Sequence, residues 1–161
     1  AFAEKNHGGS ERKTAHDADA AYTKGDYQTA YEIWLTFADK GSYAQYSLGF
    51  LYYNGQGVAQ DYSKAQQWYE LAALQGEATA QNSLATLYYE GKGVAQDYDK
   101  AQQWWEKAAI QGYGDAQFNL GALYYNGNGV PQDIGKAREY FAKAAAQGDE
   151  AAKEALQKLG K

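Results

Sequence analysis

The sequence predicts an all-α fold, a solenoid built from antiparallel helix pairs. The first indication is a repeat of 36 residues, seen in the spacing of Leu48, Leu84 and Leu120. About 24 of the 36 positions are identical between the first two full copies. The second indication is the spacing of apolar residues, which is helical in both halves of each copy. Because a single helix pair cannot bury its own apolar face, the repeated pairs are expected to stack on one another.

The first half of each copy predicts a helix, here termed helix A. Ala44, Leu48 and Tyr52 recur every four residues and therefore lie on one helical stripe. Gly55 follows this stripe, at the position where a residue with positive φ commonly ends a helix. The residue after the buried leucine is small, so helix A is able to approach its partner closely without overpacking. These small residues are Gly49, Ala85 and Gly121.

The second half of each copy predicts a second helix, here termed helix B. On one face lie residues at i, i+3, i+4 and i+7, namely Ala65, Trp68, Tyr69 and Ala72. Asp61 precedes this helix, where its carboxylate accepts hydrogen bonds from free backbone N–H groups and complements the helix dipole. Gly76 ends the helix. A bulky residue of helix B is expected to fill the space between neighbouring copies. In the three copies this residue is Trp68, Trp104 and Tyr140.

Both ends of the chain depart from the full repeat. Gly25-Asp26-Tyr27 belongs to a degenerate first unit, and the C-terminal segment has the polar outer face that a terminal cap requires. The predicted organisation is a flexible leader at 1–11 and a single repeat domain at 12–160. Within that domain we expect a degenerate unit at 12–43, full repeats at 44–79, 80–115 and 116–151, and a capping helix at 152–160.

The composition narrows the range of partners. The net charge is −5 and the pI about 5.0. Because phosphate binding requires clustered Lys and Arg, this balance argues against nucleic acid. No apolar run approaches the ~18 residues of a membrane-spanning helix, so we expect no membrane insertion. The N-terminal Ala1-Phe2-Ala3 resembles the small-residue end of a signal peptide, although an artificial start of the chain explains it equally well.

Few residues are available for chemistry. The chain has no Cys, and its two histidines, His7 and His16, both lie near the N-terminus. This composition argues against a nucleophilic triad, a zinc–thiolate site and disulfides. Asp61, Asp97 and Asp133 recur once per copy, which fits helix caps better than catalytic carboxylates. The sequence therefore predicts a protein that is not an enzyme and holds no cofactor and no metal.

Longer patterns resemble known repeat families. Leu48-Gly49-x-x-Tyr52, followed by Ala65-x-x-x-Tyr69, resembles the tetratricopeptide signature, with a period of 36 in place of about 34 residues. A longer pattern begins at Ala44 and reads Ala-Gln-x-x-Leu-Gly-x-x-Tyr-x-x-Gly-x-Gly-Val-x-x-Asp-x-x-Lys-Ala-x-x-Trp. This pattern resembles the Sel-1-like repeat (SLR) family. This resemblance implies a right-handed α/α superhelix (solenoid), common in bacterial exported or signalling proteins that act as adaptors.

The resemblance also implies where a ligand binds. In tetratricopeptide-like superhelices helix A lines the concave face, so the candidate groove residues flank its buried Leu and Tyr positions. The candidates are Tyr46, Phe50, Tyr53, Asn54, Asn82, Thr86, Tyr89, Glu90, Phe118, Tyr125 and Asn126. The row of Tyr53, Tyr89 and Tyr125 has two interpretations: a recognition surface with apolar area and polar tips, or packing against the next unit.

Three functions follow, in order of preference. The first is a non-catalytic scaffold that binds a peptide or protein segment in the concave groove, as a monomer that is periplasmic or secreted. The second is a regulatory adaptor that acts through convex or loop surfaces in the cytoplasm. The third is a binder of small molecules or cell-wall fragments with weak hydrolase activity.

Overall fold

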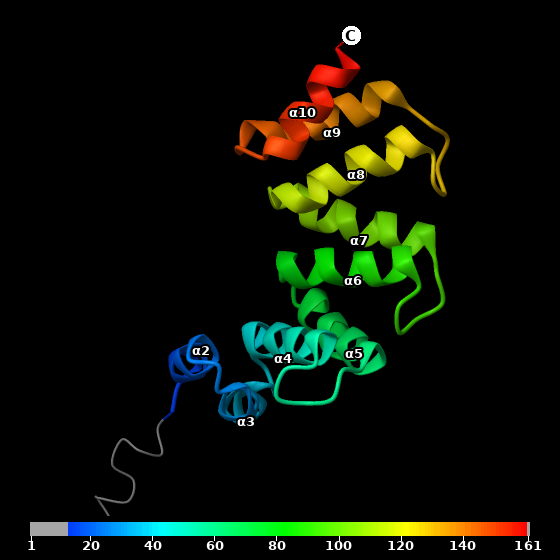
Figure 1. Ribbon diagram of the computed structural model, residues 1–161. Coiled ribbons are helices and arrows are strands. Elements are labelled where there is room, and N and C mark those ends of the chain that lie inside the picture. Colours follow the sequence, from blue (N-terminus) through cyan, green and yellow to red (C-terminus); the bar gives the residue numbers. More distant parts are fainter. Residues whose placement is uncertain (1–12, 161) are drawn as a thin grey trace, which may run out of the picture. The chain divides into compact units, whose positions relative to one another are not determined.

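The computed structural model describes residues 13–160, and the 1–11 leader predicted from the sequence lies outside them. Within the described residues the chain forms nine α-helices and no β-strand (Figure 1). They belong to two compact units, the first ending at Ala72 and the second beginning at Ala73. The helices of the first unit are α2 (Ala15–Thr23), α3 (Tyr27–Phe37), α4 (Ser42–Asn54) and α5 (Tyr62–Leu74), whose last two residues enter the second unit. Those of the second unit are α6 (Ala78–Glu90), α7 (Tyr98–Ile110), α8 (Gly114–Asn126), α9 (Ile134–Ala146) and α10 (Glu150–Leu159).

The predicted all-α solenoid of helix pairs is confirmed. Helix A of the three full repeats is α4, α6 and α8, and helix B is α5, α7 and α9; each of these six helices has 13 residues. Within the second unit, α6 packs on α7 and α8 on α9. The largest fully buried side chains are leucines of helix A, two per repeat: Leu48, Leu51, Leu84, Leu87, Leu120 and Leu123.

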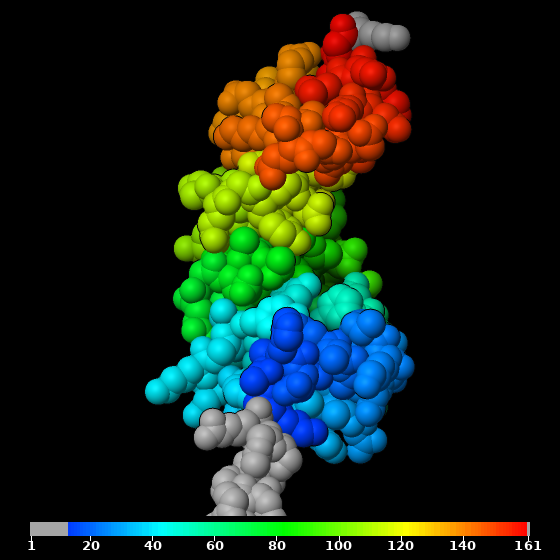
Figure 2. Space-filling view, turned by 90° about the vertical axis from the view of Figure 1, so that its left-hand side faces the viewer, coloured from blue at the N-terminus to red at the C-terminus, as the bar shows by residue number. Residues whose placement is uncertain are grey.

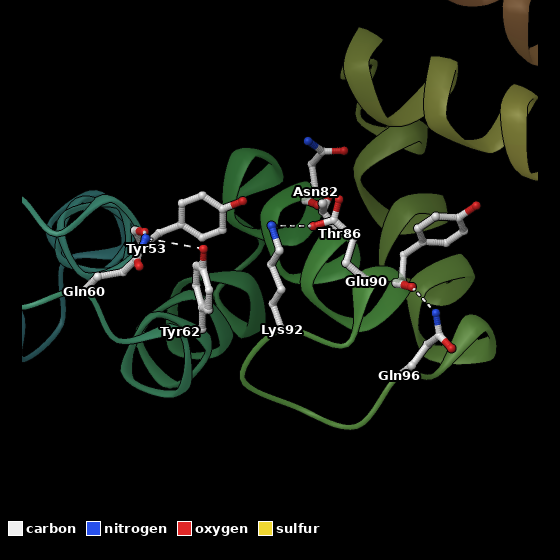
Figure 3. A network of polar contacts seen from close by, with 9 residues as sticks. Tyr53, Gln60, Tyr62, Asn82, Thr86, Glu90, Lys92 and Gln96 are labelled. Carbon is white, nitrogen blue, oxygen red and sulfur yellow. Dashed lines mark hydrogen bonds and ion pairs between the residues drawn. The ribbon is translucent and has the colours of Figure 1, made fainter.

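The loop inside each repeat is fixed at both ends by side chains. Gly55 ends α4 in the left-handed conformation with φ +68°, as predicted. Gln60 Nε2 donates to the Tyr53 carbonyl (2.9 Å) and to the Tyr62 hydroxyl (3.3 Å; Figure 3). Asp61 Oδ1 accepts from the Lys64 N–H (3.0 Å). The same contacts recur 36 residues later, from Gln96 and Asp97. The predicted caps of helix B are therefore confirmed, and the preceding Gln caps helix A.

The small residue of helix A does permit a close approach, as predicted. A Cβ atom at Gly49 would lie 2.6 Å from Tyr69 Cδ1, and one at Gly121 would lie 2.6 Å from Phe141 Cδ1. The aromatic residue of helix B that meets Gly49 or Gly121 directly follows the one expected to fill the space between copies. Tyr69, Trp105 and Phe141 are buried, whereas Trp68, Trp104 and Tyr140 are half-buried. Helical spacing places both positions on nearly the same face as the buried Ala65, and in the first and third repeats the buried ring is the one that lies against the glycine of helix A.

The second glycine of each loop forms a contact between repeats. Gly57 has φ +74°, and a Cβ there would lie 2.7 Å from the Tyr27 carbonyl oxygen at the start of α3. Gly129 has the same φ and lies against Tyr98 at the start of α7. The loop of one repeat therefore rests on the beginning of helix B in the preceding repeat.

A buried glutamine in helix A joins neighbouring repeats. Gln117 Nε2 donates to the Ala109 carbonyl (3.2 Å) at the end of helix B in the preceding repeat, and its Oε1 accepts from Gln147 Nε2 (2.7 Å), which directly follows helix B of its own repeat. Gln81 makes the equivalent pair of contacts, with Ala73 (3.1 Å) and Gln111 (2.9 Å). Since a buried amide is costly unless it is hydrogen-bonded, these chains explain why Gln recurs at a buried position.

The terminal helix α10 covers the last full repeat, as expected for a cap. It packs on α9, and Figure 2 shows its side chains (red) directly against those of α9 (orange). Asp149 caps its first turn, with Oδ1 accepting from the Ala152 N–H (3.0 Å). Ala152 is fully buried, whereas Lys153 and Glu154 are exposed.

Candidate binding surface

The tyrosines of the row Tyr53, Tyr89 and Tyr125 differ in how far they pack against the rest of the fold. Tyr53 packs on Tyr62 with ring centroids 5.2 Å apart, and Tyr89 packs on Tyr98 at 5.1 Å. The Tyr89 hydroxyl also accepts a hydrogen bond from Asn128 Nδ2 (2.6 Å). At these two positions the row therefore takes part in packing within the fold.

Tyr125 is the exception in this row. The third copy has Ile134 where the other copies have Tyr62 and Tyr98, and Tyr125 is left 45% exposed. Among the three tyrosines it is the one that presents most ring area to a ligand.

The polar candidate residues include partly buried side chains with hydrogen bonds inside the fold and side chains that are exposed. Asn82 Oδ1 accepts from Asn119 Nδ2 (3.1 Å), and the Thr86 hydroxyl donates to the Asn82 carbonyl (3.1 Å). Glu90 is exposed and forms an ion pair with Lys92 at 3.4 Å (Figure 3). Exposed asparagines end helix A in the first and third copies: Asn54, whose Nδ2 donates to the Phe50 carbonyl, and Asn126.

A pocket of about 340 Å³ in the second unit brings two of the predicted residues together. Phe118 and Tyr125 of α8 form one wall, and Phe141 of α9 lies 5.4 Å from the Phe118 ring. Helix α10 supplies the opposite wall with Glu154 and Lys158, so the pocket carries one charge of each sign. This is an apolar cavity with polar groups at its edge, as ligand pockets commonly are.

A second pocket, of about 300 Å³, lies in the first unit. Tyr46 and Phe50 of α4 line it, as do Tyr43 at the start of α4 and Trp34 of α3. Its remaining lining residues are Asp19, Tyr22, Thr23 and Ser47. Its lining residues from α2 and α3 were not predicted to bind a ligand. They are Asp19, Tyr22, Thr23 and Trp34. The only available signal was that Asp19 and Tyr22 are spaced by three on a predicted helix, and this spacing does not reveal which helix they face.

Tyr43 and Asp19 form the polar contact of this pocket. The Tyr43 hydroxyl donates to Asp19 Oδ1 at 2.8 Å. Burial, followed by the hydrogen bond to Asp19, raises the pKa of Tyr43 to about 12. Both causes act against the phenolate, because it is poorly solvated there and is repelled by the carboxylate.

This shift predicts a pH dependence of stability. Tyrosine in the unfolded chain ionises near pH 10, whereas folded Tyr43 keeps its proton until about pH 12. The contribution of this group to stability is thus complete below pH 10 and is lost as the pH rises towards 12. We expect Tyr43→Phe to make the free energy of unfolding less steeply dependent on pH over this interval. Urea denaturation at pH 9, 10 and 11 measures the slope, and an unchanged slope would contradict the assignment.

The remaining chemistry of the described residues is limited. Residues 13–160 contain no group of three or more side chains suited to holding a metal ion. Of the two histidines, His16 lies on α2 and is exposed, while His7 lies outside the described residues. Among the helices described, none combines the length and apolar character needed to cross a membrane.

Comparison with known proteins places the repeats in a family. A family profile for the Sel1 repeat matches residues 42–77, 78–113 and 114–149. The chain belongs to the Sel1 repeat family. Each Sel1 repeat begins at the first residue of a helix A: Ser42 of α4, Ala78 of α6 and Gly114 of α8. Members of this family are generally protein-interaction scaffolds, without catalytic activity of their own. Among curated proteins, no relative was found by sequence.

Solved structures of Sel1 repeat proteins are similar to this chain. One is a Sel1 repeat protein from Oxalobacter formigenes (33% identity, TM-score 0.84, covering 89% of this chain and 59% of that one). Another is c5321, a protective antigen present in uropathogenic Escherichia coli strains, with an SLR fold (36% identity, TM-score 0.83, covering 92% of this chain and 34% of that one). A third is Helicobacter pylori cysteine rich protein B (28% identity, TM-score 0.60, covering 92% of this chain and 100% of that one). This chain thus spans less than two thirds of the length of the first two.

Proposed function

We propose that this chain is a non-catalytic scaffold that binds a peptide or protein segment through the helix A side of its Sel1 repeats. The observation that carries the proposal is the pocket beside α8, where Phe118 and the exposed Tyr125 face α10. Aromatic rings with polar tips are enriched among the residues that dominate binding energy at protein interfaces. Family membership supports the same function, because Sel1 repeat proteins generally mediate protein interactions.

We further propose that the protein is bacterial and acts as a monomer in the periplasm or outside the cell. The similar structures come from bacteria, and one of them is a protective antigen. Expression of the full-length gene in its native host, followed by cell fractionation, tests the compartment directly.

Peptide selection tests the groove. A random peptide library displayed on phage is selected on the immobilised protein, and the affinity of each selected peptide is measured by calorimetry. We expect Phe118→Ala and Tyr125→Ala each to weaken binding about tenfold or more, because centrally placed aromatic residues commonly contribute on this scale. Unchanged affinity in both variants would exclude this pocket as the binding site.

Exposed apolar residues of helix B favour a second candidate function. Ile110 at the end of α7 is 87% exposed, and Leu74 at the end of α5 is 69% exposed. The two positions are equivalent, 36 residues apart, so two of the three full repeats expose a large apolar side chain there, whereas the third has Ala146. These side chains suit an adaptor that docks through its helix B surface.

The same selection separates the two functions. Ile110→Ser and Leu74→Ser remove the helix B surface and leave the pocket intact, so under the groove hypothesis they keep full affinity. If these variants lose binding and the Phe118 and Tyr125 variants retain it, the helix B surface is the interface.

A further inference from the structure

The pocket of the first unit differs in chemistry from the one beside α10. Its walls are rings from three helices: Tyr22 of α2, Trp34 of α3, and Tyr46 and Phe50 of α4, with Tyr43 at the rim. Only one side chain in its lining, Asp19, is charged. The pocket beside α10, in contrast, holds both Glu154 and Lys158.

The rings form a continuous wall. The Tyr22 ring centroid lies 6.1 Å from that of Trp34 and 6.3 Å from that of Phe50. Tyr46 continues the wall at 6.2 Å from Phe50. On the other side, Tyr43 lies at 6.3 Å from Trp34 in an edge-on arrangement. Since each aromatic face carries partial negative charge, such a wall attracts a cation.

The carboxylate is held at the rim of this wall. Tyr43 donates its hydroxyl proton to Asp19 Oδ1 at 2.8 Å, which fixes the orientation of the carboxylate. A carboxylate has about four acceptor sites, so Asp19 retains the capacity to accept charge-assisted hydrogen bonds from a ligand. Tyr43 is 47% exposed and Phe50 is 36% exposed, so the pocket opens to solvent on this side.

We propose that this pocket binds a Lys or Arg side chain of the partner segment, with the cationic head at Asp19 and the alkyl stem along the rings. The inference rests on the proposed function, because it names the chemistry of one residue in the bound segment. A volume of about 300 Å³ lies at the small end of ligand pockets and suits a single long side chain. An uncharged side chain would leave the Asp19 carboxylate partly desolvated and without a new partner, which disfavours it.

The net charge of the protein acts in the same direction. At −5 it attracts basic segments over a distance of about one Debye length, roughly 8–10 Å. The pocket beside α10 serves as an internal comparison, since Lys158 in its lining repels a cation there.

The test uses small probes on the whole protein. N-acetyl-lysine methylamide, its norleucine analogue and tetramethylammonium are titrated while the indole N–H signal of Trp34 is followed by NMR. We expect the lysine probe to shift that signal in a saturable manner and to bind at least tenfold more tightly than the norleucine probe. We expect Asp19→Asn, which keeps an acceptor for Tyr43, to weaken the lysine probe about tenfold. The matched change Asp39→Asn, at an exposed position of the same unit outside the pocket lining, should leave its affinity unaltered.

Three results would overturn the inference. Equal binding of the norleucine probe would show an unspecific apolar pocket. Tighter binding of tetramethylammonium than of the lysine probe would assign the site to small organic cations. No saturable shift with any probe would show that the pocket binds no cation.

The two proposals can fail separately. Selected peptides that need Phe118 and Tyr125 but tolerate Asp19→Asn would remove the inference and leave the scaffold function intact. If the lysine probe binds but no peptide depends on Phe118 and Tyr125, the cation pocket stands and the α8 groove does not.

Discussion

Replacing Gly57 by alanine is expected to lower the free energy of unfolding by about 3 kcal/mol. Two costs add at this position. A left-handed conformation, here φ +74°, costs an L-residue about 1–2 kcal/mol. The new Cβ would also lie 2.7 Å from the oxygen and 2.8 Å from the carbon of the Tyr27 carbonyl, which belong to the backbone and cannot rotate away. The loop must therefore move off α3, and overpacking of this kind costs about 1–3 kcal/mol.

Gly25→Ala provides the matched control. Gly25 lies in the same unit and has φ +88°, but a Cβ there would meet nothing within 4 Å. Only the conformational cost applies, so we expect a loss of about 1–2 kcal/mol. Urea denaturation followed by circular dichroism measures both variants, and their difference isolates the contact between loop and α3. Equal losses would mean that this contact contributes nothing to stability in solution.

Gly121→Leu has the second largest expected effect, a loss of about 2 kcal/mol. The side chain would begin 2.6 Å from Phe141 Cδ1 and 3.0 Å from Cγ, so α8 and α9 must separate. Against the overpacking cost stands a gain of about 0.8 kcal/mol, because leucine favours a helix more than glycine does. The steric term wins because Phe141 is itself buried and cannot turn outward.

Two comparisons define this effect. Gly121→Ala should cost at most about 1 kcal/mol, because the second repeat accommodates a fully buried alanine, Ala85, at the same position. Gly135→Leu makes the same chemical change on α9 at an exposed position, where a Cβ would approach only Asp133 Oδ1 at 3.4 Å, and should be neutral or slightly stabilising. If Gly121→Leu proved as stable as Gly135→Leu, the tight packing of α8 on α9 would be refuted.

The fold was predictable because the repeat gives the same information several times. The 36-residue period, the leucine stripe and the Asp and Gly residues at the ends of the helices each indicate one helix pair. Contacts between pairs were harder to predict. The period shows that Gln117 recurs, but only the folded chain shows that its amide meets Ala109 and Gln147. Likewise, helical spacing places Trp68 and Tyr69 on nearly the same face, so it does not decide which of them is buried.

The candidate surface was predictable only in part. The sequence placed Phe118 and Tyr125 on the helix A side, and the structure brings them into one pocket. It also grouped Tyr53 and Tyr89 with Tyr125, although two of the three pack on a tyrosine of helix B. Asp19 and Tyr22 were not identified, because the degenerate first unit lacks the repeat pattern that reveals which residues share a surface. Where the repeat breaks down, side-chain positions depend on packing that spacing alone does not determine.

The buried glutamines of helix A determine how the number of repeats in such a protein can change. Each copy carries both halves of the junction, a donor to the preceding copy and an acceptor for the following one. The amide of Gln81 or Gln117 donates to the carbonyl of Ala73 or Ala109 in the preceding copy, and Gln111 or Gln147 of the same copy holds that amide in place. Duplication or loss of 36 residues therefore regenerates every junction, whereas an insertion between the alanine and the glutamine separates the donor from its acceptor. The number of copies is therefore free to vary in evolution, whereas the length of each copy is constrained. A longer protein can be assembled from this unit with the same contacts at every junction between copies.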